Sequence, residues 1–361
     1  MARLVLLGGG HSHIEVLRQA PAMALPAGIV LIDPNPALPY TGMVPGYVAG
    51  IYHRSDILID LVALCARAGA TLKRARGVGI DARSRLVHCD DGSTVGYDVL
   101  SIDIGSTLDT AVPGVVEHAL CVRPLWRFVS AWPRSLASDA NAVVVGAGAA
   151  GIELALAVHA SIQALGNTPN VTVVGDAASI APGLPERARV QLQRICEARG
   201  ICLQLGARVS RVTHDSVRLD TGATIDAHTV LWATGPAPHA WLRETGLELD
   251  ERGYLATDEC LRVGGRPDIY AAGDVASIVR HARPKAGVYA VREAPVLSDN
   301  LNRALRGEKP RRYIPQRHAL ALIGTADHRA VGAYGRLSAE GAWLWRWKDA
   351  IDRKFVRRYR A

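Results

Sequence analysis

A short apolar run that ends in a glycine-rich turn and leads into a helix occurs twice in this 361-residue chain. In the first copy, the apolar residues 3–7 stop at Gly8-Gly9-Gly10 and helical spacing follows over 12–20. A second apolar run, 28–32, then ends at Asp33. Strand, glycine turn, helix, strand and acid in this order predict a βαβ unit of the kind that binds a dinucleotide.

The second copy carries the complete glycine fingerprint. A predicted strand over 141–145 is followed by Gly146-Ala147-Gly148-Ala149-Ala150-Gly151, a predicted helix over 152–165 and a strand over 171–174. A buried turn rich in Ala and Gly is the alternative, but the flanking strand and helix favour nucleotide binding. The fold class that follows is α/β, with two Rossmann-like dinucleotide-binding domains of the three-layer ββα type and a small C-terminal region.

The domain boundaries follow from where the second βαβ unit begins and where the chain returns to the first. We expect the first dinucleotide domain to be discontinuous, built from residues 1–115 and 255–315, because a late apolar strand over 269–272 and a helix over 287–305 return to it. Residues 120–250 would form the second domain. Residues 316–361 would form a separate C-terminal region.

Composition narrows the classes of protein. The formal net charge of +8 and pI of about 9.4 favour acidic partners such as nucleotide phosphates, anionic lipid or nucleic acid. Hydrophobic residues at 49% and charged residues at 21% exclude a disordered chain and a membrane bundle. The six cysteines form no C-x-x-C pair, and no signal precedes the first strand. We therefore expect a reduced, cytoplasmic protein with no disulfide framework and no metal site.

The glycines of the first turn have a physical role. Gly8 permits the tight bend, and Gly10 lets the backbone approach a pyrophosphate at the N-terminus of the helix, where free N–H groups and the positive end of the dipole lie. Asp33, 25 positions after Gly8, stands near the place where an acid binds a ribose hydroxyl.

The strand that follows the second turn ends in Gly175-Asp176. Many NAD-binding domains carry the ribose-binding acid at the position of Gly175. Here the acid, Asp176, stands one residue later and would have to take that role from a shifted position. The next arginine along the chain that could hold a 2′-phosphate is Arg187. This pattern favours NADH as the nucleotide, with NADPH as the alternative.

With both units and the late Gly273-Asp274 in place, the chain resembles the flavoproteins that have two dinucleotide-binding domains. It is most similar to the branch of the pyridine nucleotide-disulfide oxidoreductases that includes the type II NADH dehydrogenases. Three segments look closer still to the flavoprotein domain fused to some selenide, water dikinases, and they are LGGGHSH (7–13), PYTGMVPG (39–46) and KAGVYAVR (285–292). The dikinase portion itself is absent from this sequence.

The resemblance implies that the first domain holds FAD. Gly8, Gly10 and Asp33 match the phosphate and ribose positions of the family, with His11 and Ser12 as turn residues beside the phosphates. The family pattern extends to residues that meet the adenine, the ribityl chain and the flavin, and these are Pro45, Val78, Gly105, Gly273, Asp274, Gly287 and Val288.

The resemblance also implies that the second domain holds NADH. The matching positions are Gly146, Gly148, Gly151, Glu153, Asp176 and Gly235. Glu153 matches a family acid near the nicotinamide end, and we expect it to orient the ring rather than to transfer a proton. Lys285 either biases the charge of the flavin or is simply solvated. Hydride transfer from nicotinamide to flavin is cofactor chemistry, for which the protein supplies alignment.

The predicted function is that of an FAD-dependent NAD(P)H oxidoreductase passing electrons to a quinone-like or other small acceptor. The family's disulfide reductases carry a cysteine pair that residues 40–50 lack, and the type II enzymes carry a glutamine-containing quinone motif where this chain has AVREAP (290–295). Two alternatives stay open. One is a reductase linked to selenium or sulfur metabolism, and the other is a flavin-bound sensor or scaffold with little turnover.

The last segment, 343–360, is basic and aromatic, and its large apolar residues are predicted to share one helical face, namely Leu344, Trp347, Ile351, Phe355 and Tyr359. A basic amphipathic helix with tryptophans can lie in a lipid interface, so we expect a membrane surface as a partner and a peripheral location on the inner face of the membrane. The alternative is a helix packed on the FAD domain or on a second subunit of a homodimer. We expect no nucleic-acid partner, because the basic cluster belongs to no recognition fold.

Overall fold

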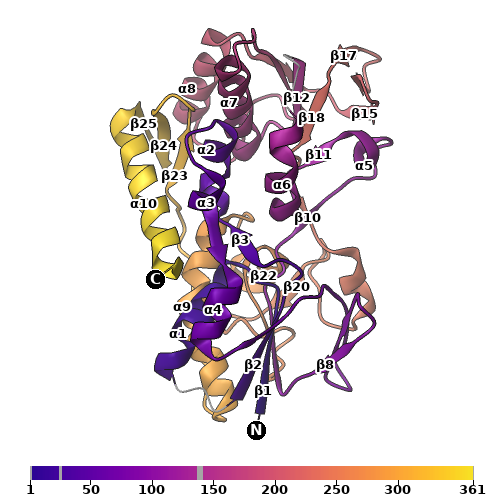
Figure 1. Ribbon diagram of the computed structural model, residues 1–361, viewed down its shortest axis with the longest axis vertical. Helices are drawn as coiled ribbons and strands as arrows, with labels where there is room; N and C mark the ends of the chain where they lie inside the picture. The colour runs from indigo at the N-terminus through magenta and orange to yellow at the C-terminus, as the bar shows by residue number, and fades with distance from the viewer. Residues whose placement is uncertain (1, 24–26, 136–140, 361) are drawn as a thin grey trace.

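The computed structural model describes residues 2–23, 27–135 and 141–360 and has two α/β halves with a C-terminal region beside both (Figure 1). The first half contains a five-stranded parallel sheet in the order β21-β9-β1-β2-β5. The strand that closes the sheet comes from far along the chain, so this half is built from two separate stretches of sequence. Its strands are β1 (Ala2–Leu7), β2 (Ala27–Ile32), β5 (Thr71–Lys73), β9 (Val99–Ile102) and β21 (Ile269–Ala271).

The central strand of this sheet is buried on both faces, which is why its sequence is apolar without alternation. Leu4 and Leu6 of β1 face a core that they share with Ile14 of α1 (His11–Met23). Val5 and Leu7 face a second core on the other side. The helices α1, α4 (Leu61–Ala68) and α9 (Gly287–Leu305) pack on the first face and bring their N-termini to the carboxyl edge of the sheet.

The second half repeats the arrangement, with a parallel sheet in the order β11-β18-β12-β13-β14. α7 (Ala149–Ala164) begins three residues earlier than predicted, directly after the glycine turn. α8 (Glu186–Ala198) also packs against this half. The strands are β11 (Leu120–Cys121), β12 (Asn141–Val145), β13 (Asn170–Gly175), β14 (Cys202–Leu205) and β18 (Thr229–Trp232).

Each half carries an antiparallel three-stranded sheet as its outer layer. Two chain segments cross between the halves side by side as an antiparallel pair, β10 with β19. The strands of these layers and of the crossing are β6 (Gly77–Asp81), β7 (Leu86–Cys89), β8 (Thr94–Gly96), β15 (Val209–Val212), β16 (Ser216–Leu219), β17 (Thr224–Asp226), β10 (Thr107–Leu108) and β19 (Pro236–Ala237).

Residues 34–50 are rich in Pro, Gly and Tyr, a composition that predicts a loop over a ligand, but they contain regular structure instead. β3 (Ala37–Pro39) pairs with β4 (Leu58–Asp60), and a 3₁₀ turn leads into α2 (Val44–Val48). Pro45 at the first turn of α2 lacks an N–H that the helix would leave free in any case, so a proline-rich sequence can still be helical here. α2 packs against α7 of the second half, and this places the segment between the two halves.

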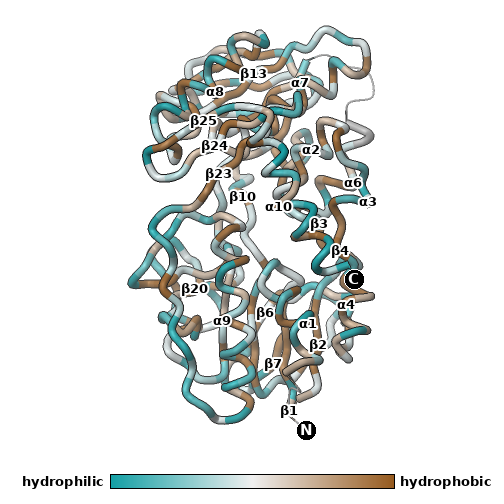
Figure 2. The backbone as a smooth tube through the Cα atoms, turned by 90° about the vertical axis from the view of Figure 1, so that its left-hand side faces the viewer, coloured by the Kyte–Doolittle hydropathy of each residue, from teal (hydrophilic) through white to brown (hydrophobic). Residues whose placement is uncertain are grey.

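The C-terminal region is an antiparallel sheet followed by a long helix, α10 (Ala342–Arg360), that packs on the first half. Figure 2 shows α10 as a mostly hydrophilic segment, and the helix predicted over 343–360 is present, but its five large apolar residues are not all buried. Leu344 and Tyr359 are buried, but Trp347 and Ile351 are exposed, and the buried face is completed by Asp352 and Val356. The sheet strands are β23 (Ala321–Gly324), β24 (Ala330–Tyr334) and β25 (Leu337–Gly341).

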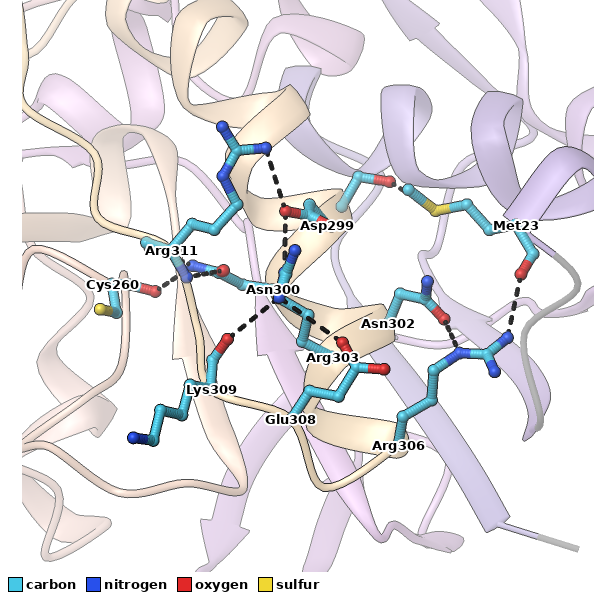
Figure 3. A network of polar contacts seen from close by, with 11 residues as sticks. Met23, Cys260, Asp299, Asn300, Asn302, Arg303, Arg306, Glu308, Lys309 and Arg311 are labelled. Carbon is cyan, nitrogen blue, oxygen red and sulfur yellow. Dashed lines mark hydrogen bonds and ion pairs between the residues drawn. The ribbon is translucent and has the colours of Figure 1, made fainter.

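A polar network fixes the end of α9 that lies away from the cleft between the halves (Figure 3). The side-chain amide of the buried Asn300 donates to the carbonyls of Cys260 and Arg311, and its oxygen accepts the Arg311 N–H. Burying an amide is costly unless its hydrogen bonds are made, so these contacts hold the helix in register with the surrounding loops.

Short elements of the remaining chain are α3 (Arg54–Ile57), α5 (Val115–His118), α6 (Leu125–Ser135), β20 (Leu255–Thr257) and β22 (Ala276–Ile278).

Candidate active site

One cavity of about 1790 Å³ lies between the two halves and the C-terminal region. It runs from the first glycine turn, past the N-terminus of α9, to the start of α7 and the inner side of α10. The residues predicted from the sequence that line it are Gly8, Gly10, His11, Asp33, Pro45, Gly105, Asp274, Gly287, Val288, Gly148 and Glu153.

The first glycine turn sits where the carboxyl ends of β1 and β9 meet. Gly8 has φ +90°, and a Cβ atom there would lie less than 3.0 Å from the backbone of Asp103. The Gly9 N–H donates to the Asp33 carboxylate at 2.7 Å, and the Asn35 N–H donates to its other oxygen at 2.8 Å. Burial raises the pKa of Asp33 and these two N–H groups oppose it, so the carboxylate is held at the end of β2 beside the turn.

Asp103, at the end of β9, is a buried acid that the sequence did not single out. Its carboxylate accepts the N–H groups of Ser12 at 2.7 Å and His13 at 3.2 Å, and so caps the N-terminus of α1 from behind the turn. Burial raises its pKa to about 7, against the effect of the two N–H groups. A Cβ atom on Gly10 would meet this carboxylate at less than 3.0 Å, so only glycine fits between Asp103 and the cavity.

Two more carboxylates lie where β21 turns toward α9. Glu293 of α9 accepts the Gly273 N–H at 2.7 Å, and burial raises its pKa to about 7. Asp274 is paired with Arg123 at 2.7 Å, and Arg123 also donates to the Ser106 hydroxyl. Arg123, between β11 and α6, therefore brings a positive charge from the second half to the predicted ribityl-binding acid.

At the second glycine turn, the Gly146 carbonyl packs against the first turn of α7, and a Cβ atom on Gly151 would overlap it. Glu153, one turn further along α7, reaches the cavity with a side chain that is 12% exposed. Its carboxylate accepts the Gly324 N–H of β23 at 2.7 Å. Burial raises the pKa of Glu153 above its ordinary value. Glu153, which follows the second glycine turn, therefore contacts the C-terminal region as well as its own domain.

Lys348 of α10 is the lysine that the structure brings to Glu153. Its ammonium lies 2.8 Å from Asp352, 3.9 Å from Glu153, and donates to the Gly42 carbonyl. Burial lowers the pKa of Lys348, but the two carboxylates outweigh it and raise the pKa. Three ionisable side chains from two helices therefore share one enclosed site. Sequence reasoning missed Lys348 because it stands in a run of basic residues.

An aromatic group closes the cavity near the first turn. Phe355 of α10 stacks on Tyr40 with ring centroids 4.4 Å apart, and His11 contacts both rings at 5.7 and 5.8 Å. Burial lowers the pKa of His11 to about 4, so its ring is neutral. The buried His11 Nε2 has no hydrogen-bond partner within the described residues, which marks it as a group that a ligand would satisfy.

Several predicted site residues lie outside this cavity. Lys285 donates to the Ala276 carbonyl and lies over the Tyr254 ring at 4.0 Å, beside a much smaller pocket that Gly273 also lines. Val78 is 43% exposed on β6, although its neighbour Gly77 lines the cavity. The others are set back in the turns or at their rim, namely Ser12, Gly146, Gly151, Asp176 and Gly235. Among the described residues, no group of three or more His, Cys, Asp or Glu could hold a metal ion.

The cavity fits FAD on three observations. The glycine turn leaves no room for a side chain in front of Asp103, and the buried His11 nitrogen lacks a partner within the described residues. α9 begins at Gly287, after the N-cap Ala286, with no side chain capping its N–H groups. A pyrophosphate can approach the backbone at the glycine turn. The free N–H groups at the N-terminus of α9 can bind the polar edge of a flavin. Two such halves, facing each other across one cavity, define an oxidoreductase of the class with paired dinucleotide-binding domains.

Comparison with known proteins gives the family. The family model described as pyridine nucleotide-disulphide oxidoreductase matches residues 2–294, so the chain belongs to that family. It is an FAD-dependent NAD(P)H oxidoreductase with two Rossmann-like domains, as predicted.

Named relatives agree with the family, and solved structures share the fold. The chain is 29% identical to NADH dehydrogenase-like protein MT1860 of Mycobacterium tuberculosis, over 77% of this chain and 73% of that one. It is 25% identical to NADH dehydrogenase-like protein YutJ of Bacillus subtilis, over 96% and 99%. Its fold is similar to the sulfide:quinone oxidoreductase of Aquifex aeolicus (TM-score 0.83, 18% identity, covering 100% of this chain and 92% of that one) and to NDH2 from Plasmodium falciparum in complex with NADH (0.79, 15%, 99% and 98%).

Proposed function

We propose that this chain oxidises NADH and delivers the electrons to a quinone in the part of the cavity that the C-terminal region walls. The relatives include the demethylphylloquinone reductase NdbB of Synechocystis, which is 26% identical over 75% of this chain and 71% of that one. The observation that carries the proposal is the site formed by Glu153, Lys348 and Asp352, beside apolar lining from Leu322 and Ile351. An apolar wall suits a quinone ring, and the ionisable group suits the protons that quinone reduction consumes.

The residues of this chain have separable tasks in that reaction. Gly8, Gly10 and Asp33 would hold the FAD phosphates and ribose, and Gly148 would meet the pyrophosphate of NADH. Bound FAD supplies the chemistry that accepts hydride and passes electrons on. Glu153 orients the nicotinamide end, as the resemblance implies. Beyond that expectation, its carboxyl would also exchange a proton in the cavity, and Lys348 favours release of that proton because its ammonium lowers the pKa of Glu153.

The direct test is an anaerobic titration of the purified protein followed at the flavin absorbance. We expect a yellow protein that NADH bleaches and that a water-soluble quinone analogue reoxidises. Turnover with the quinone analogue is then compared with turnover with selenium and sulfur species. A protein that cannot be reconstituted with FAD contradicts the proposal, and reoxidation by sulfur or selenium species alone would favour the alternative linked to their metabolism.

We also propose that α10 lies on a membrane surface. Trp343, Trp347 and Ile351 follow each other at every fourth residue and are 56, 46 and 42% exposed, with Arg346 and Lys354 nearby on the helix. Ile351 lines the cavity too, so the apolar stripe leads from the surface to the proposed quinone site. Tryptophan and basic residues on one exposed helix suit an anionic lipid interface. No helix in the described part of the chain is long and apolar enough to cross a membrane.

Vesicle sedimentation tests this surface. The variant Trp343→Ser/Trp347→Ser should bind vesicles that contain anionic lipid at least about tenfold more weakly, because each buried tryptophan contributes on the order of 1–2 kcal/mol. Val190→Ser, at an exposed apolar residue of α8, is the matched control. Unchanged sedimentation would contradict the proposal. If the double variant instead turns a dimer into a monomer in gel filtration, the stripe is the interface of a homodimer.

A further inference from the structure

The carboxyl end of β13 cannot carry the acid that many NAD-binding domains place there. Gly175 is the last residue of β13, and a Cβ atom on it would lie less than 3.0 Å from the Cβ atom of Ala147 in the second glycine turn. The Ala147 carbonyl accepts the Ala181 N–H at 2.7 Å, so the turn is fixed from its other side and cannot give way easily. The acid nearest to this strand end is the next residue, Asp176, and we take it as the group that would meet the adenosine ribose.

A second chain segment runs beside Asp176. The Ala207 N–H donates to the Gly175 carbonyl at 3.2 Å, and the Gly206 N–H donates to the Ala177 carbonyl at 3.1 Å. These two backbone bonds bind the connection between β14 and β15 to the end of β13. They place the Arg208 guanidinium 3.9 Å from the Asp176 carboxylate, with both side chains open to solvent at 76 and 68%.

The pair combines the two chemistries that distinguish the nucleotides. A carboxylate accepts hydrogen bonds from the free ribose hydroxyls of NADH, and a guanidinium binds the 2′-phosphate of NADPH with paired, charge-assisted bonds. Both stand at the same corner of the second half, and an exposed ion pair at 3.9 Å is weak enough to exchange for a ligand. Arg189 of α8, which donates to Ser179 in the same loop, adds positive charge there.

We propose that Asp176 and Arg208 together select the nucleotide, with Arg208 forming a 2′-phosphate site that Asp176 keeps closed. The proposal rests on the proposed function in that the second half binds NAD(P)H. In the unaltered protein, Asp176 repels a 2′-phosphate and neutralises Arg208, so NADH is preferred. Removing the carboxylate frees the guanidinium, so one substitution opens the site to NADPH without any added arginine.

Binding of the two adenosine fragments tests this directly by titration calorimetry. The unaltered protein should bind 5′-ADP more tightly than 2′,5′-ADP. Asp176→Ala should tighten binding of 2′,5′-ADP by about 10- to 100-fold, the range of a charge-assisted contact. Adding Arg208→Gln should abolish most of that gain. The matched controls are Asp226→Ala and Arg211→Gln, exposed residues on the neighbouring hairpin that change the net charge by the same amounts.

The same variants are then compared for the rate at which NADH and NADPH bleach the flavin. A gain for 2′,5′-ADP that survives Arg208→Gln, or equals that in Asp226→Ala, would overturn the inference. So would an Asp176→Ala protein with no gain at all. If the fragments bind as expected but neither NADH nor NADPH bleaches the flavin, the selection site stands and the proposed function is the part that fails.

Discussion

Gly10→Val should yield a colourless protein, with less than about a tenth of the FAD content of the unaltered chain. The added Cβ atom would lie less than 3.0 Å from the Asp103 carboxylate, which caps α1 through the Ser12 and His13 N–H groups. This clash can be relieved only if the carboxylate or the turn moves. Overpacking of this kind lowers the free energy of unfolding by about 1–3 kcal/mol. The valine side chain would also block the approach of a pyrophosphate to the turn. The ratio of flavin to protein absorbance measures the effect.

Gly28→Ala is the control for this loss, because a Cβ atom on Gly28, in β2, meets nothing within 4 Å. It should retain both its colour and its thermal unfolding temperature. A Gly10→Val protein that keeps full FAD content would show that the first turn does not face the cofactor, and the assignment of this half to FAD would have to be abandoned.

Lys348→Met should lower kcat with a quinone analogue by about 100-fold while leaving FAD content unchanged. The substitution removes the positive charge between Glu153 and Asp352 but keeps the length of the side chain. Burial already raises the pKa of Glu153, and Lys348 opposes that rise, so without the lysine the pKa rises further. Glu153 is then protonated over a wider pH range, and the pH profile of kcat should move upward. A purely structural defect would lower kcat without moving that profile.

The same change has a consequence for stability that depends on pH. A carboxyl whose pKa is higher in the folded than in the unfolded chain stabilises the fold at low pH, and this contribution is lost as pH rises through the folded pKa. Lys348→Met should therefore be more destabilised, relative to the unaltered protein, at pH 8 than at pH 5. The difference should be about 2 kcal/mol, below the range for a fully buried broken pair. Lys354→Met on the exposed side of α10 is the control and should show neither effect.

The two βαβ units could be predicted from the sequence because several independent signals coincide there. Apolar runs, glycines that need unusual backbone angles and a helix opening follow in fixed order, and β12 and α9 have the predicted bounds. Residues 34–50 were harder, since proline and glycine suggest a loop even where the first turn of a helix tolerates them. Asp103 gave little signal, because an acid at the end of an apolar strand has the same pattern whether it caps a helix or faces solvent.

The buried side of α10 could not be predicted from its apolar residues. Trp347 and Ile351 remain exposed, whereas the buried stripe runs through Lys348 and Asp352. A buried ion pair has the spacing of a core face but the composition of a surface, so periodicity of hydrophobic residues cannot find it. Only the carboxylate of Glu153, almost two hundred residues earlier in the sequence, explains why a lysine faces inward.

The last helix is fastened at both ends to different halves of the molecule. Near the C-terminus, Arg358 and the Tyr359 hydroxyl bind the buried Glu15 of α1 at 2.6 and 3.0 Å. Toward its start, Lys348 reaches Glu153, and Glu340 just before the helix pairs with Arg194 of α8. Any swing of one nucleotide lobe away from the other would break these bonds together. We therefore expect α10 to oppose an opening of the cavity between the two halves, because such an opening would have to break its contacts with one of them.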